Sequence, residues 1–182
     1  GNHDWASVDF FPIDYFNPQA AQAILWTKKN LSSSAKLFLK SLKLIHEEKD
    51  FILVHGSLNA PEDFNYMNDD YAAQQSFSIL HKEVCFVGHT HFPGIFIMDS
   101  REKLEYRKDS SIAIKKGNKY IINVGSVGQP RDGNPASSYG IFDSEKKTFE
   151  LKRVAYDSKE TREKIYAQGL PVFLADRLLA GR

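Results

Sequence analysis

The stretch Val84-Cys85-Phe86-Val87-Gly88-His89-Thr90-His91 runs from four apolar residues straight into a compact polar cluster. A short apolar run that ends at a glycine is typical of a strand buried on both faces. The same design occurs at residues 51–57, where Phe51-Ile52-Leu53-Val54 leads into His55-Gly56-Ser57. Ligands of open α/β sheets bind beyond the carboxyl ends of such strands. We therefore expect both clusters to lie at one site.

Turn and cap signals predict further elements on either side of these two strands. Helices are expected from Asn17-Pro18, from Ser32 through Leu39, over about Asp70–Leu80, and from about Ser158, where Asp157 and Glu160 offer a capping box. Strands are expected at residues 42–46 and 51–54 as a hairpin, at 84–87 and 94–98, and as the pairs 111–115 with 120–123, across a turn at 116–118, and 139–143 with 148–154. Residues 59–68, rich in Pro, Asn and Asp, are expected to form a loop. The sum is a strand-rich α+β or layered α/β fold.

The length of 182 residues predicts a single domain over residues 1–182. With 24 Lys plus Arg against 23 Asp plus Glu, the net charge of +1 argues against bulk binding of nucleic acid. One cysteine cannot form an internal disulfide, which fits a reducing compartment. No apolar stretch approaches the roughly 20 residues of a membrane helix. We therefore expect a soluble, cytoplasmic protein without a membrane partner.

The chain opens on a third polar cluster, Gly1-Asn2-His3-Asp4, which could be a frayed terminus without a role. Four of the six histidines, however, lie in the three clusters: His3, His55, His89 and His91. Any one of them alone is better explained as a structural residue. As a set they favour a metal site, because imidazole and amide or carboxylate oxygens bind Zn, Mn, Fe, Co or Ni. The remaining two, His46 and His81, do not follow the pattern and are interpreted as structural.

In order and spacing, Gly1-Asn2-His3-Asp4, Val54-His55-Gly56 and Gly88-His89-Thr90-His91 resemble the last three motifs of the calcineurin-like metallophosphoesterases. The run Asn123-Val124-Gly125-Ser126-Val127-Gly128-Gln129-Pro130-Arg131 is similar to a stretch in the small prokaryotic phosphodiesterase-like branch of that superfamily. The resemblance spans residues 1 to about 143. It implies two mixed β-sheets that pack as a sandwich and are flanked by helices, here without the first strands of the family.

The resemblance also implies a role for each motif residue. Asn2, His55 and His89 would bind the second of two divalent transition-metal ions, and His91 would bind the first. His3 would stand beside the leaving oxygen as a catalytic group, with Asp4 orienting it. The two ions, Mn in the first place and otherwise Fe, Zn, Ni or Co, would share a water that attacks a phosphomonoester or phosphodiester.

The family pattern also contains Asp-x-His and Gly-Asp-x-x-Asp before the first motif seen here. This sequence offers no substitute, because no histidine has Asp two positions earlier and none of the 11 glycines is followed by Asp. A bridging carboxylate could come from Asp9, Asp63, Asp69 or Asp70, and the sequence selects none of them. We therefore expect the C-terminal portion of a longer enzyme. Its exposed sheet edge would pair with an N-terminal fragment or with a second copy as a homo-oligomer.

Two further residues are candidates for substrate binding. The guanidinium of Arg131 matches a pair of phosphate oxygens, although an arginine in a Gly/Pro loop can equally stabilise a turn. Asn123 is the other candidate, although such an asparagine more often ends a strand. In the loop after His55, Phe64 and Tyr66 could contact the base or aryl group of a nucleotide-like phosphate ester.

Three hypotheses for function follow from these residues. The leading one is a metal-dependent phosphohydrolase. The second, favoured if the chain is complete, is a non-catalytic interaction module that keeps the fold without a full dinuclear centre. A structural zinc site made of Asn2, His55, His89 and His91 is the third, and it is weaker because such sites usually contain thiolates.

Overall fold

The computed structural model describes residues 1–182. The chain divides into two compact units, one formed by residues 1–43 and 157–180 and the other by residues 44–156 and 181–182. Helices make up the first unit, and all the strands belong to the second. This division does not test whether the whole chain is a single domain, which stays a prediction.

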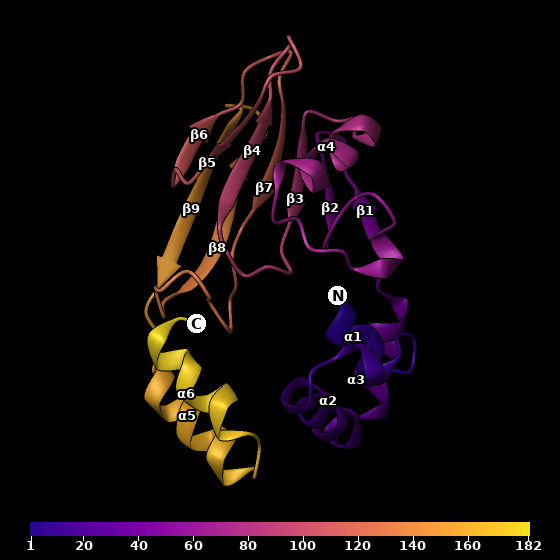
Figure 1. Ribbon diagram of the computed structural model, residues 1–182, viewed down its shortest axis with the longest axis vertical. Coiled ribbons are helices and arrows are strands. Elements are labelled where there is room, and N and C mark those ends of the chain that lie inside the picture. The colour runs from indigo at the N-terminus through magenta and orange to yellow at the C-terminus, as the bar shows by residue number, and fades with distance from the viewer. The chain divides into compact units, whose positions relative to one another are not determined.

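The second unit is built on a six-stranded mixed sheet (Figure 1). Its strands, in spatial order, are β1 (Ile45–Glu47), β2 (Phe51–Val54), β3 (Val84–Val87), β7 (Lys119–Asn123), β4 (Gly94–Met98) and β5 (Leu104–Arg107). The three neighbours β2, β3 and β7 run parallel, and the other pairs are antiparallel. Because parallel strands end at the same edge, the residues that follow β2, β3 and β7 come together.

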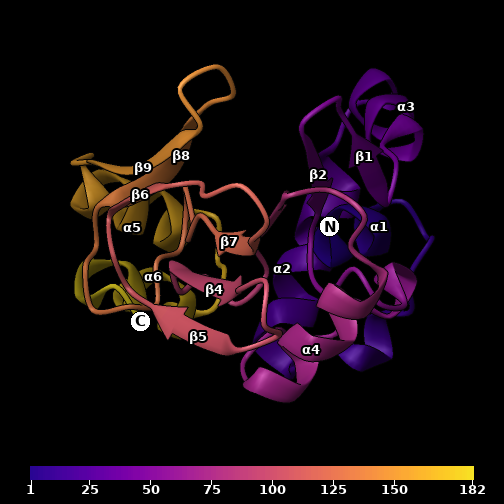
Figure 2. The ribbon, with the colours of Figure 1, turned by 90° about the horizontal axis from the view of Figure 1, so that it is seen from above.

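A smaller antiparallel sheet covers one face of the large sheet, and a helix covers the other (Figure 2). The small sheet has the order β6 (Ser111–Ala113), β9 (Thr148–Val154) and β8 (Ser137–Asp143). Along β7, Tyr120 and Ile122 join the cluster that contains Phe149 of β9. Ile121 points the other way and joins the cluster of Phe77 in α4 (Asp70–Ile79). This alternation builds the sandwich that the resemblance implied, and the predicted fold is confirmed.

The first unit consists of helices whose starts follow from their cap residues. They are α1 (Asn2–Ser7), the 3₁₀ turn η1 (Ile13–Tyr15), α2 (Pro18–Asn30), α3 (Ser33–Ser41), α5 (Ser158–Ala167) and α6 (Val172–Ala180). The side chains of Asn17, Ser32 and Asp157 each accept a hydrogen bond from the backbone N–H three residues on, at 3.0, 3.1 and 2.8 Å. These helix starts are therefore confirmed. None of the helices combines the length and the apolar composition that a membrane span requires.

The structure contains several local features that the sequence analysis did not predict. Residues 2–7 form α1, which the sequence analysis did not predict. The tail is two helices, because Gly169 adopts a φ of +65° and Pro171 follows it. The edge strand β5 was missed because Leu104-Glu105-Tyr106-Arg107 carries two charges in four residues. In the loop at 59–68, residues Pro61–Asp63 form a short 3₁₀ turn, η2.

Two strand predictions also need correction. The strand expected at 42–46 begins only at Ile45, and its partner β2 is not buried on both faces, because Leu53 is 39% exposed. Residues 111–113 and 119–123 belong to different sheets, with the turn at 116–118 carrying the chain from one layer to the other. Adjacency in sequence therefore did not predict pairing here.

Candidate metal centre

The carboxyl ends of the parallel strands bring two histidines together. His55 directly follows β2, and Gly88-His89 follows β3. The N–H of Gly88 donates to the carbonyl oxygen of His55 at 2.9 Å, which ties the two strand ends to each other. The ring centroids of His55 and His89 are 4.8 Å apart. The structure thus places these two side chains side by side, while their role as metal ligands stays a prediction.

The loop after His55 supports this pair from the side. It passes so close to Gly56 that a Cβ there would lie 2.8 Å from the carbonyl oxygen of Asn65. Tyr66 stacks on the imidazole of His89, with centroids 4.0 Å apart and ring planes 11° apart. Phe64 is only 4% exposed, so the prediction that it contacts a substrate is wrong, since a core side chain presents no face to a ligand.

The backbone of the Gly88–His91 loop is unusual at both of its histidines. His89 has a φ of +61° and His91 a φ of +64°, in the left-handed region that non-glycine residues rarely adopt. Each such residue costs of the order of 1 kcal/mol and persists where the surroundings enforce it. This backbone conformation lets two histidine side chains project from the same short loop, one on each side of Thr90 in the sequence.

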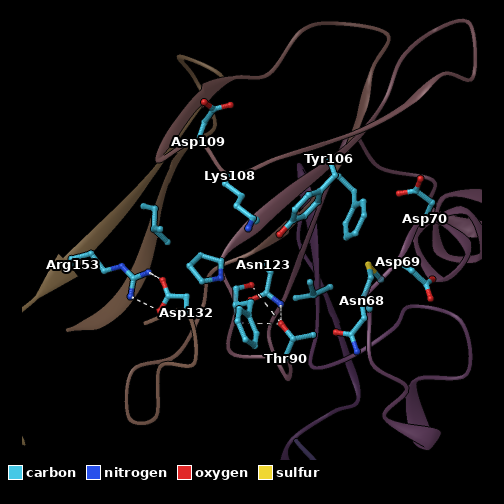
Figure 3. Close-up of a pocket in the computed structure, with 17 residues that line it drawn as sticks. Asn68, Asp69, Asp70, Thr90, Tyr106, Lys108, Asp109, Asn123, Asp132 and Arg153 are labelled. Carbon is cyan, nitrogen blue, oxygen red and sulfur yellow. Dashed lines mark hydrogen bonds and ion pairs between the residues drawn. The ribbon is translucent and has the colours of Figure 1, made fainter. Parts of the chain in front are cut away.

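Asn123, at the end of β7, holds this loop in place (Figure 3). Its Nδ2 donates to the carbonyl oxygen of Gly88 at 2.7 Å and to Oγ1 of Thr90 at 2.9 Å. Its Oδ1 accepts from the N–H of Gly125 at 2.9 Å. Asn123 and Thr90 are 9% and 6% exposed. These contacts favour a positioning role for Asn123, and its predicted contact with substrate is not tested by them.

His91 is oriented by a hydrogen bond to the backbone. Its Nδ1 donates to the carbonyl oxygen of Gln129 at 2.7 Å. A carbonyl can only accept, so Nδ1 carries a proton, and in the neutral imidazole Nε2 then carries the lone pair. Histidines that bind metals are commonly oriented in this way by a second partner. Sequence reasoning missed Gln129 because it acts through its backbone, for which the residue type gives no signal.

Arg131 lies in the same loop as Gln129 and is joined to the histidines through it. The N–H of Arg131 donates to the carbonyl oxygen of His91 at 3.3 Å, and its Nη2 donates to Oε1 of Gln129 at 3.1 Å. The Nε atom is buried and has no hydrogen-bond partner. A buried donor without a partner is rare and costly. It fits the side of a guanidinium that binds an anion.

The predicted residues of the chain start lie in the first unit, all within α1. The Oδ1 of Asn2 is buried and has no hydrogen-bond partner, which fits an amide oxygen that binds a cation. The ring of His3 packs edge-on against Phe16 at 4.9 Å. The carboxylate of Asp4 accepts from the backbone nitrogen of Gly1 at 2.8 Å. The predicted catalytic roles of His3 and Asp4 remain untested.

The predicted ligands are residue types that suit a transition metal, although the metal itself stays a prediction. Imidazole nitrogens and an amide oxygen are suitable ligands for the predicted ions. No group of three or more His, Cys, Asp or Glu side chains is arranged around one point in the structure. The two remaining histidines make surface hydrogen bonds, His46 with Glu48 at 2.8 Å and His81 with Glu47 at 3.0 Å. Their structural interpretation is confirmed.

Residues 1–147 match the family model described as the calcineurin-like phosphoesterase superfamily domain, and the chain belongs to this family. The resemblance stated from the motifs is thereby confirmed. Membership implies phosphoester hydrolysis that depends on divalent metal ions. The family does not specify which metal, which ester or how many ions take part.

Similar proteins support this assignment. The chain is 41% identical to an uncharacterized protein, MJ0912, from Methanocaldococcus jannaschii, over all of this chain and 74% of that protein. It is 28% identical to phosphodiesterase YfcE from Escherichia coli K12, over 57% of this chain and 39% of that enzyme. A metallophosphoesterase from Sphaerobacter thermophilus superposes over all of this chain and 75% of its own, with a TM-score of 0.84 and 36% identity. A hypothetical protein, PH1004, from Pyrococcus horikoshii OT3 shares the fold, with a TM-score of 0.77 over all of this chain and 71% of its own, and 17% identity.

The contacts of Thr90 predict a matched pair of variants. Its Oγ1 accepts from Nδ2 of Asn123 and from the N–H of Phe92, the latter at 3.1 Å. Thr90→Val keeps the shape but removes the acceptor of one Nδ2–H of Asn123 and of the N–H of Phe92, and should lower the free energy of unfolding by about 1–3 kcal/mol. Thr90→Ser keeps the hydroxyl and should lose less than half as much. Urea unfolding measures both, and equal losses would show that the hydroxyl does not hold the loop.

Proposed function

We propose that this protein is a metal-dependent phosphohydrolase that cleaves a phosphomonoester or phosphodiester at a centre of two divalent metal ions. Family membership supplies the reaction class, and the paired histidines at the carboxyl ends of β2 and β3 are the observation that carries the proposal. Bound there, two cations would neutralise the phosphate charge and lower the pKa of the attacking water toward ~7.

Four side chains are the proposed metal ligands, and separate observations favour them. Asn2, His55 and His89 would hold one cation and His91 the other, with Mn²⁺ as the first choice. The unpartnered Oδ1 of Asn2 and the Nδ1–H tautomer of His91 are the forms that a cation requires. Asn123 and Thr90 would keep His89 and His91 aimed while substrate binds and leaves.

The remaining residues would act on the ester. The guanidinium of Arg131 would bind a phosphoryl oxygen through its buried Nε. His3 would give a proton to the departing alkoxide, with Asp4 orienting it, because an imidazole titrates close to neutral pH. Tyr66, which is 49% exposed and stacked on His89, would form a wall for the organic part of the ester, such as a nucleoside.

The test is hydrolysis of bis(p-nitrophenyl) phosphate by the full-length protein, first stripped with EDTA and then reloaded with Mn²⁺. We expect turnover only in the reloaded sample, together with two metal ions per chain by elemental analysis. A rate that persists in EDTA would contradict the proposal. A protein that binds no metal and shows no turnover would instead be the non-catalytic module.

A further inference from the structure

A cavity lies within the strand-bearing unit, beside the Gly88–His91 loop (Figure 3). Its volume of about 530 Å³ is in the range of small-molecule sites. The start of α4 forms one wall, and Tyr106 and Lys108, at and just after the end of β5, form another. Thr90 of the Gly88–His91 loop and Asn123, which holds that loop in place, also line the cavity. His55, His89 and His91 do not line it, so it is distinct from the proposed metal centre.

The charges around this cavity leave one cation without an ionic partner. Asp132 pairs with Arg153 across the wall formed by β9, and Asp109 pairs with Arg107. Lys108 makes no ion pair, and Figure 3 shows its side chain pointing into the cavity. An ammonium group in this position attracts an anion and repels a cationic ligand.

Tyr106 provides a second donor in the same wall. The hydroxyl end of its ring lies against Gly94, where a Cβ would come within 2.1 Å of the hydroxyl oxygen, and the ring packs on Phe96 with centroids 4.7 Å apart. The hydroxyl points into the cavity (Figure 3). A tyrosine hydroxyl is protonated and able to donate at neutral pH, and burial raises its pKa further in the same direction. The absence of a side chain at Gly94 is therefore what allows the hydroxyl this position.

Asp69 and Asp70, at the start of α4, limit what else can bind. Oδ1 of Asp69 accepts from the N–H of Ala72 at 2.9 Å, which leaves its charge in the wall of the cavity. Asp70 occupies the first turn of the same helix. Their carboxylates repel a second anionic group and accept hydrogen bonds from hydroxyl groups. A matching ligand has one anionic group, which faces Lys108 and Tyr106, and an uncharged part with hydroxyl groups, which faces Asp69 and Asp70.

We propose that this cavity binds the phosphoryl or carboxylate group of a small hydroxylated monoester or acid, through Nζ of Lys108 and the hydroxyl of Tyr106. This inference does not depend on the metal centre or on hydrolysis. The ligand could be the uncleaved end of a substrate or a separate effector, and both share the same oxyanion chemistry.

The test is a calorimetric titration of the full-length protein in EDTA with glycerol 3-phosphate, glycerate or inorganic phosphate. All titrations use the Arg131→Met protein, so that the phosphoryl contact proposed for Arg131 cannot account for any binding. We expect saturable binding of glycerol 3-phosphate, weakened about tenfold by Lys108→Met and several-fold by Tyr106→Phe. Choline, a cation of similar size, should not bind. Tighter binding of glycerol 3-phosphate than of inorganic phosphate would support an organic ligand, and the reverse would overturn that part of the proposal.

Two control variants match the test variants. Lys116→Met removes an exposed lysine in the 116–118 turn, and Tyr139→Phe alters a tyrosine on β8 that is 43% exposed, the same as Tyr106. Both should bind glycerol 3-phosphate like the parent protein. The proposal is overturned if no ligand saturates, or if Lys108→Met and Tyr106→Phe bind as tightly as their controls. Hydrolysis by the Mn²⁺-loaded protein is assayed separately, so a failure here and a failure of the proposed function are distinguishable.

Discussion

His89→Ala is expected to abolish the Mn²⁺-dependent hydrolysis of bis(p-nitrophenyl) phosphate and to weaken metal binding by about 100-fold or more. The substitution removes the imidazole that lies 4.8 Å from His55 and stacks on Tyr66. Alanine at a φ of +61° keeps the backbone strain of the parent, so the main change is the missing ligand. Initial rates and a metal-competition titration measure the two effects.

The matched control is His81→Ala, which removes a surface histidine that pairs with Glu47. It should retain full activity and metal content, because His81 lies in none of the three polar clusters that contain the predicted ligands. Near-ultraviolet circular dichroism of both variants verifies that the fold is intact. Turnover by His89→Ala that matches His81→Ala, with the metal still bound, would rule out His89 as a ligand.

The central part of the site was predictable because it follows from strands that carry their own signal. Val84–Val87 and Phe51–Val54 are apolar runs that end at glycine-flanked histidines, and parallel pairing brings their ends together. The helix starts at Asn17 and Ser32 were predictable for the same reason, since a cap is a local contact. In each case, residues close together in the sequence were sufficient to predict the structure.

The hydrogen bonds that hold the site residues in place were not predictable, because they join residues far apart in the chain. The bond from Asn123 to Thr90 spans 33 residues, and that from His91 to Gln129 spans 38. The left-handed backbone of His89 and His91 depends on such contacts rather than on residue type. The exposure of Leu53 likewise reflects the position of β2 next to the edge strand β1, which an apolar run does not reveal.

Cys85, on the central strand β3, is expected to react with thiol reagents about 1,000-fold more slowly in the folded protein than in the unfolded chain at pH 8. It is fully buried, and burial raises the pKa of its thiol from 9.0 to about 12. Only the thiolate is nucleophilic, so the raised pKa lowers the reactive fraction before any steric protection is counted. Ellman's reagent with and without urea measures the difference. Equal rates in the two states would contradict the burial.

The same shift predicts how stability changes at alkaline pH. The thiol of the unfolded chain ionises near pH 9.0, whereas the folded thiol stays protonated up to about pH 12. Its contribution to stability is therefore complete below pH 9 and is lost as the pH rises, by about 1.4 kcal/mol per pH unit. Cys85→Ala starts from a lower stability because it leaves a small cavity. Its stability should nevertheless fall less steeply between pH 9 and 11, since lysines and tyrosines titrate alike in both proteins. Parallel curves would show that Cys85 ionises equally in the folded and unfolded states.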